Sequence, residues 1–147
     1  MLLSEPLVRL NEVILKIRET LDFMRFLQEN HAATPAAQDL DGQEAAYRQS
    51  ISELQEDVRR LGGLPRDVDP EFEMVEQAWA ELKAVFGENE ESALLQELNK
   101  FRYGIIDTVQ WALEVDYPQD LKLRLQRVSR YTQDVMAGPE RAERRAQ

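Results

Sequence analysis

The chain contains one histidine, His31, and no cysteine, which removes most of the residues that carry chemistry in proteins. Without cysteine there are no disulfides, thiolate zinc sites, iron–sulfur clusters or cysteine nucleophiles. His31 follows an apolar periodic segment and begins a polar stretch, where we expect a solvated side chain and not a general base. No serine has a histidine and an acid arranged around it, and no glycine-rich phosphate loop opens a helix. The sequence therefore predicts no enzyme, no catalytic residue and no cofactor.

Carboxylates are the remaining candidates for a site, because the chain has 28 Asp and Glu against 18 Lys and Arg. A di-iron site in a helical bundle needs Glu on two helices and Glu-x-x-His on the other two. No Glu-x-x-His occurs here. A site made of carboxylates alone would suit Mg²⁺, Ca²⁺ or Mn²⁺ better than iron. The candidates for such a site are Glu12, Glu19, Glu53, Glu97 and Asp107.

These carboxylates, like Glu56, Glu73 and Glu76, fall beside the apolar positions of their segments. We therefore expect a solvated acidic face and no metal ligands.

The net charge of −10 argues against two classes of partner. Nucleic acid binding draws most of its affinity from Lys and Arg on phosphates, and an anionic membrane surface repels an acidic domain. The first residues lack the basic and apolar regions of a signal peptide, and no run approaches the length that spans a bilayer. Because the absence of cysteine also fits a reducing compartment, we expect a soluble, cytoplasmic protein with no nucleic acid and no membrane partner.

Two tryptophans and one arginine series can serve either packing or recognition. Trp79 lies on an apolar seam, so we expect it in the core. Trp111 lies beside a seam, where core packing is the main expectation and a subunit interface is the alternative. Arg124, Arg127 and Arg130 recur every three residues and would either meet an acidic face of another helix or subunit or form solvated ion pairs, the commoner outcome.

The apolar residues recur alternately three and four positions apart, which predicts amphipathic helices and no strand. We expect helices over 5–29, 41–61, 70–86, 90–114 and 118–137. Their expected starts are capped by Ser4, by Asp41 with Glu44 as a capping box, and by Asn89. Gly62-Gly63 and Gly138-Pro139 are expected ends. The residues predicted to fill the middle of the core are Ile14, Ile17, Leu21, Ile51, Leu54, Val58, Leu98, Ile105, Leu125 and Val128.

This pattern predicts an all-α, four-helix bundle in which the short 70–86 helix crosses between two halves. A flat array of five helices is the alternative. Residues 1–138 would form one domain, and 139–147 a charged, disordered tail.

Four segments carry a resemblance to a known family: 58–65 (VRRLGGLP), 78–83 (AWAELK), 93–97 (ALLQE) and 117–127. They resemble helices of small bacterial ferritin-like bundle proteins of unknown function, and the likeness covers roughly 44–135. The resemblance implies a ferritin-like bundle that often self-associates, and in some relatives metal binding through Glu and His. The expected histidines are absent here, and Asn99–Tyr103 replaces an acidic run, so the metal ligands are expected to be lost.

We therefore expect a non-enzymatic structural or protein-interaction bundle of degenerate ferritin-like type. It would self-associate as a homodimer or larger assembly and could bind a further protein partner. The alternative is a ferritin-like metal-binding protein with a carboxylate-only site.

Overall fold

The computed structural model describes residues 4–65, 77, 79–81 and 89–146, and no strand occurs among them. The helices are α1 (Glu5–Asn30), the short 3-10 helix η1 (Pro35–Ala37), α2 (Leu40–Arg60), α4 (Glu90–Ala112) and α5 (Gln119–Ala146). The all-α prediction is confirmed for this part of the chain. Most of the predicted 70–86 helix lies outside the described residues. No helix in the described part is long and apolar enough to cross a membrane.

The core forms where the predicted seams meet. All ten residues predicted for its middle are buried, and the two helices that begin the chain supply six of them. Helix α1 buries the widest face, because Phe23, Met24, Phe26 and Leu27 extend its seam toward two neighbours at once. The apolar spacing of the sequence was therefore sufficient to place the core.

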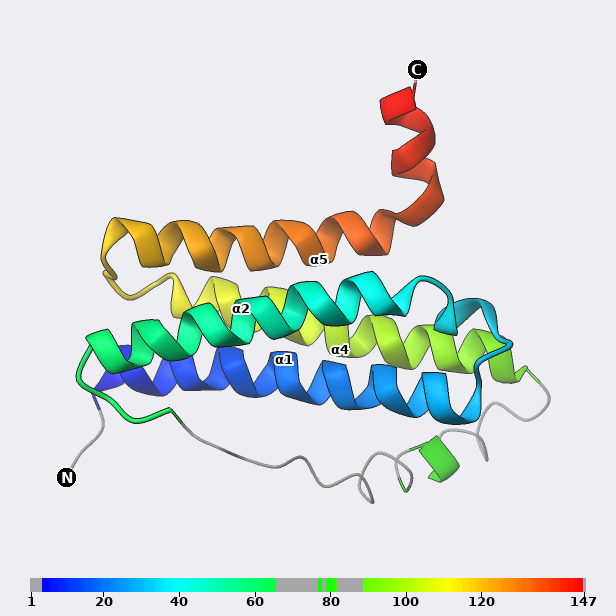
Figure 1. Ribbon diagram of the computed structural model, residues 1–147, viewed down its shortest axis with the longest axis horizontal. Coiled ribbons are helices and arrows are strands. Elements are labelled where there is room, and N and C mark those ends of the chain that lie inside the picture. Colours follow the sequence, from blue (N-terminus) through cyan, green and yellow to red (C-terminus); the bar gives the residue numbers. More distant parts are fainter. Residues whose placement is uncertain (1–3, 66–76, 78, 82–88, 147) are drawn as a thin grey trace.

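The four long helices form a closed ring of contacts in the order α1, α2, α5, α4 (Figure 1). Arg9, near the start of α1, donates to the carbonyl oxygen of Trp111 at the end of α4 over 2.7 Å. His31, just after α1, lies 3.3 Å from Glu90 at the start of α4. These two contacts make α1 and α4 antiparallel. The closed ring does not match the flat array kept as an alternative.

Helix α5 is antiparallel to α2 by the same kind of evidence. Tyr47, early in α2, bonds Thr132, midway along α5, whereas Asp57, late in α2, bonds Arg124, early in α5. Since the sequential helices α1 and α2 are also antiparallel, α2 and α4 point in the same direction (Figure 1). The chain from Leu61 to Asn89 therefore joins opposite ends of the bundle.

The end of α2 follows the predicted glycine signal. Gly62 adopts φ +86°, which a side chain would strain, and its N–H donates to the carbonyl of Arg59. The next N–H, of Gly63, donates to the carbonyl of Val58 over 2.9 Å. A Cβ at Gly63 would lie 2.7 Å from the side chain of Leu7, so a larger residue at this position would require the Leu7 side chain to shift.

Three local predictions differ from the structure. The expected capping box is wrong, because α2 begins at Leu40 and Asp41 in its first turn accepts a bond from Gln28. The segment between the expected helices 5–29 and 41–61, for which no helix was predicted, contains η1. Helix α5 has a non-helical residue at Gly138, where its end was predicted, but it continues to Ala146 in a new direction (Figure 1).

The register of α2 can be tested with neighbouring residues. Leu54→Ala should lower the free energy of unfolding by about 2–5 kcal/mol, because it removes buried methyl groups and leaves a cavity. Glu53→Ala should change it by less than about 0.5 kcal/mol, because Glu53 is partly exposed and, among the described residues, accepts a bond only from Gln49 of its own helix. Urea unfolding followed by circular dichroism gives both values. Equal losses for the two variants would contradict the register.

Candidate functional site

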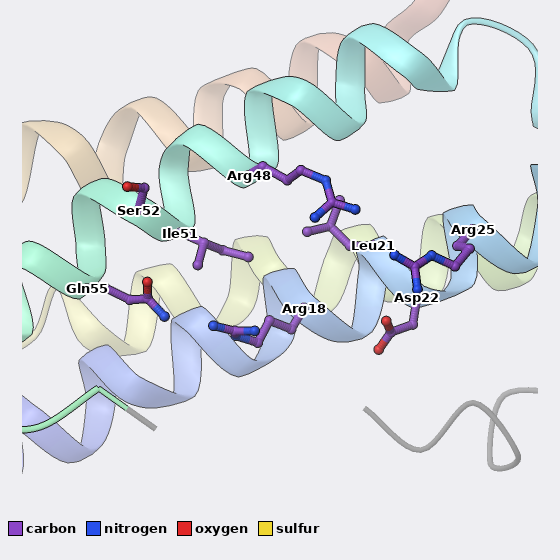
Figure 2. A pocket seen from close by; sticks show the side chains of 8 residues that line it. All are labelled: Arg18, Leu21, Asp22, Arg25, Arg48, Ile51, Ser52 and Gln55. Carbon is purple, nitrogen blue, oxygen red and sulfur yellow. The ribbon is translucent and has the colours of Figure 1, made fainter. Parts of the chain in front are cut away.

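A cavity of about 360 Å³ lies between α1 and α2, and we call it the arginine groove (Figure 2). Leu21 of α1 and Ile51 of α2 form its apolar wall. Both helices also project polar side chains toward it. The complete lining is Arg18, Leu21, Asp22, Arg25, Arg48, Ile51, Ser52 and Gln55.

Three of these eight residues are arginines, in a chain whose net charge is −10. Guanidinium groups present a planar fork of donors that matches carboxylate and phosphate oxygens. Arg48 already bonds Glu44 at 2.6 Å, but this is an exposed pair one turn apart on α2. Such pairs contribute only about 0.3–0.5 kcal/mol, so an incoming anion can replace Glu44 at little cost.

Asp22 is the one carboxylate in the lining, and its surroundings disfavour its charge. Burial raises the pKa of Asp22 to about 6, although Arg25, Arg18 and Arg48 act in the opposite direction and Glu19 adds to the rise. Its Oδ2 atom is buried and has no hydrogen-bond partner among the described residues. The groove is therefore suited to anions, and more so when Asp22 is protonated.

The spacing of three charged residues on α1 could have indicated this groove, but charged residues were assigned to a solvated face. Arg18, Asp22 and Arg25 are four and three residues apart, so they share one face of α1. Leu21, which is part of the predicted seam, lies directly beside that face. Arg48 comes from α2, and only the packing of the two helices brings it to the same cavity.

A second polar cluster links α2 to α5 through a buried ion pair. Asp57 is only 3% exposed, and it accepts from both Nε and Nη2 of Arg124, with Nε at 2.7 Å. These bonds hold the pKa of Arg124 above its ordinary value. Asp120 also accepts from Arg124. Arg124 therefore meets an acid of another helix, contrary to the commoner expectation of a solvated pair, while Arg127 and Arg130 are exposed.

The predicted carboxylate candidates do not come together. Glu12, Glu19, Glu53 and Glu97 are partly exposed on three different helices, and Asp107 is exposed. Glu19 lies 3.5 Å from Lys16 of its own helix, and Glu56 pairs with Arg59 one turn along α2. Glu73 and Glu76 lie outside the described residues. Within the described ranges, no three His, Asp or Glu side chains are close enough to hold a metal ion.

His31 is not solvated as expected, since its side chain is only 15% exposed. Its ring packs against those of Phe26 and Trp79, with centroids 5.3 and 5.5 Å away, and its Nδ1 faces Glu90. Trp79 is buried, which confirms its place in the core.

Trp111 is 37% exposed, so the core prediction for it is wrong. The guanidinium of Arg9 lies 4.6 Å from the centre of its ring and also bonds Glu5 and Glu114. A cation stacked on an indole face is a favourable contact that leaves the ring edge in water.

No model of a known protein family matches the sequence, and comparison with curated proteins and with solved structures gives no match either. The ferritin-like resemblance of its segments thus stays a prediction.

The Asp57–Arg124 pair can be tested on helix α5. Arg124→Met should lower the free energy of unfolding by about 3 kcal/mol, because Asp57 would stay buried without its two strongest bonds. Arg127→Met, the same change at an exposed position of α5, should cost less than about 0.5 kcal/mol. Replacing both partners, with Asp57→Leu and Arg124→Met, should recover most of the loss. Equal effects of the two single changes in urea unfolding would contradict a structural role for the pair.

Proposed function

We propose that the chain is a non-enzymatic protein-interaction bundle whose arginine groove binds an acidic segment of a protein. In this proposal the bundle is ferritin-like, with a connection that crosses between its halves and without the metal ligands of such folds. The observation that carries it is the convergence of Arg18, Arg25 and Arg48 on one cavity of a strongly acidic chain.

The shape of the groove favours a peptide over a small inorganic anion. Its apolar wall of Leu21 and Ile51 would contact an aliphatic side chain, while the arginines would bind carboxylates on either side of it. Arginine clusters are a recurring means of recognising acidic motifs in proteins. We also propose that the chain self-associates, in which case a second copy would supply the acidic segment.

The charge of Asp22 makes this binding dependent on pH. Above a pKa of about 6 the ionised carboxylate offsets one arginine and repels an acidic peptide, and below it that repulsion is lost. Glutamates in a peptide ionise near pH 4.3, so they are still charged at pH 5.5. Affinity should therefore rise as the pH falls from 7.5 to 5.5.

The test uses a fluorescein-labelled peptide of alternating Glu and Leu, titrated with the protein and followed by anisotropy. Arg18→Gln and Arg25→Gln should each weaken binding about tenfold, the loss expected for one charged hydrogen bond. Arg130→Gln, which makes the same change in charge on α5, should have little effect. Asp22→Asn should bind tightly at both pH values and remove the pH dependence.

Two outcomes would contradict the proposal. One is that Arg130→Gln weakens peptide binding as much as Arg18→Gln does, which would mean that binding depends on overall charge and not on the arginine groove. The other is a failure of the peptide to bind at low ionic strength. Light scattering on the purified protein tests the source of the segment, because a monomer at high micromolar concentration would rule out a second copy.

The alternative function, a metal-binding protein with a carboxylate-only site, predicts that the stability of the fold depends on the metal. A fold built on buried carboxylates would lose stability when its metal is removed, because the charges would lose their compensation. We expect no change in melting temperature on dialysis against EDTA, because the core is formed by apolar seams. Manganese or iron retained in stoichiometric amount after dialysis, with a fall in melting temperature on chelation, would favour the metal-binding alternative.

A further inference from the structure

A second cavity, of about 530 Å³, lies at the end of the bundle where α2 begins, and we call it the Arg102 cavity. It is bounded by η1, the first turns of α2, the first half of α4 and the part of α5 before Gly138. Its apolar lining includes Leu95, Leu98, Val135 and Met136. Its volume falls in the range typical of sites for small organic ligands.

Arg102 lies in the wall of this cavity and is only 5% exposed. It occupies a seam position of α4, four residues after Leu98 and three before Ile105, where the pattern calls for an apolar residue. Its Nη1 donates to Asn99 over 3.1 Å and its Nη2 to Gln43 over 2.7 Å. Its Nε is buried without a partner among the described residues.

Both acceptors of Arg102 are neutral amides, so they leave its charge without an opposite charge. No carboxylate of the described side chains lies within ion-pair distance of it, and burial lowers its pKa. The nearby rings of Tyr47 and Tyr131 are phenols whose own pKa is raised, chiefly by burial, so they are neutral near pH 7. A buried cation with no counter-charge is costly to the fold.

We propose that the Arg102 cavity binds a small monocarboxylate with an apolar body. The carboxylate would accept from the guanidinium of Arg102, and the aliphatic part would contact Leu95, Leu98 and Val135. Asp39 is the one acidic residue in the lining, so a ligand with a second negative charge is disfavoured. The carboxylate of the ligand would thus supply the negative charge that the bundle lacks beside Arg102.

Octanoate is the probe, and octanamide is its neutral match. The expected result is that octanoate binds the full chain in isothermal titration calorimetry and raises its melting temperature. Octanamide should bind about tenfold more weakly or not at all, because it cannot form the charged bond. The dicarboxylate suberate, of the same chain length, should also bind more weakly than octanoate.

Three variants separate this site from general effects. Arg102→Met should abolish octanoate binding while raising the melting temperature of the unliganded chain, an effect that a structural role alone would not give. Ala137→Trp should also abolish binding, because the indole would fill the cavity while residue 102 stays arginine, and this keeps the test valid if Arg102→Met does not fold. Arg18→Gln, in the arginine groove, should bind octanoate as the unchanged chain does.

Equal binding of octanoate and octanamide, or octanoate binding that survives Ala137→Trp, would overturn the proposal. Failure of octanoate to bind at millimolar concentration would overturn it as well. The arginine groove and the Arg102 cavity share no lining residue, so either proposal can fail without the other.

Discussion

The bundle depends on the breadth of the apolar face of α1. Helix α1 buries twelve residues, whereas α2 buries six. The difference arises because aromatic and aliphatic residues widen the seam of α1 on both sides. A narrow heptad seam could satisfy one neighbour, but the face of α1 packs against α2 and α4 together. Helix α5 is then held against those two helices and completes the ring.

Polar residues take some of the seam positions on which this packing relies. Thr132 of α5 donates to the carbonyl of Val128, so its oxygen accepts the buried bond from the Tyr47 hydroxyl. Arg102 and Asp57 add charged groups near the two ends of α2. Apolar contacts allow small shifts of one helix along another, whereas directional hydrogen bonds do not. These polar residues therefore fix the axial register between neighbouring helices.

The sequence predicted the four long helices and the core because both follow from the repeat of apolar residues. It failed where a polar side chain occupies an inward position. Arg102 lies between Leu98 and Ile105 at the spacing of a buried position. A rule that places every charged residue in solvent instead assigns that buried position to the neighbouring Phe101. Asp57 was missed for the same reason, although it is one position from the buried Val58. The spacing of residues within one helix could not predict the arginine groove or the Arg102 cavity. Each is lined by residues of different helices, and the sequence of a single helix does not say how the helices pack together.

The antiparallel ring of helices has an electrostatic consequence at its ends. Each peptide helix carries a partial positive charge at its N-terminus and a partial negative charge at its C-terminus. At one end of this bundle the starts of α1 and α5 lie beside the ends of α2 and α4, and at the other end α1 ends where α2 and α4 begin, while α5 turns away after Gly138 (Figure 1). At the end where α1 and α5 begin, the partial charges of the four helix termini therefore offset one another in pairs. The anion binding that we propose for the arginine groove and the Arg102 cavity therefore relies on arginine side chains and not on helix termini.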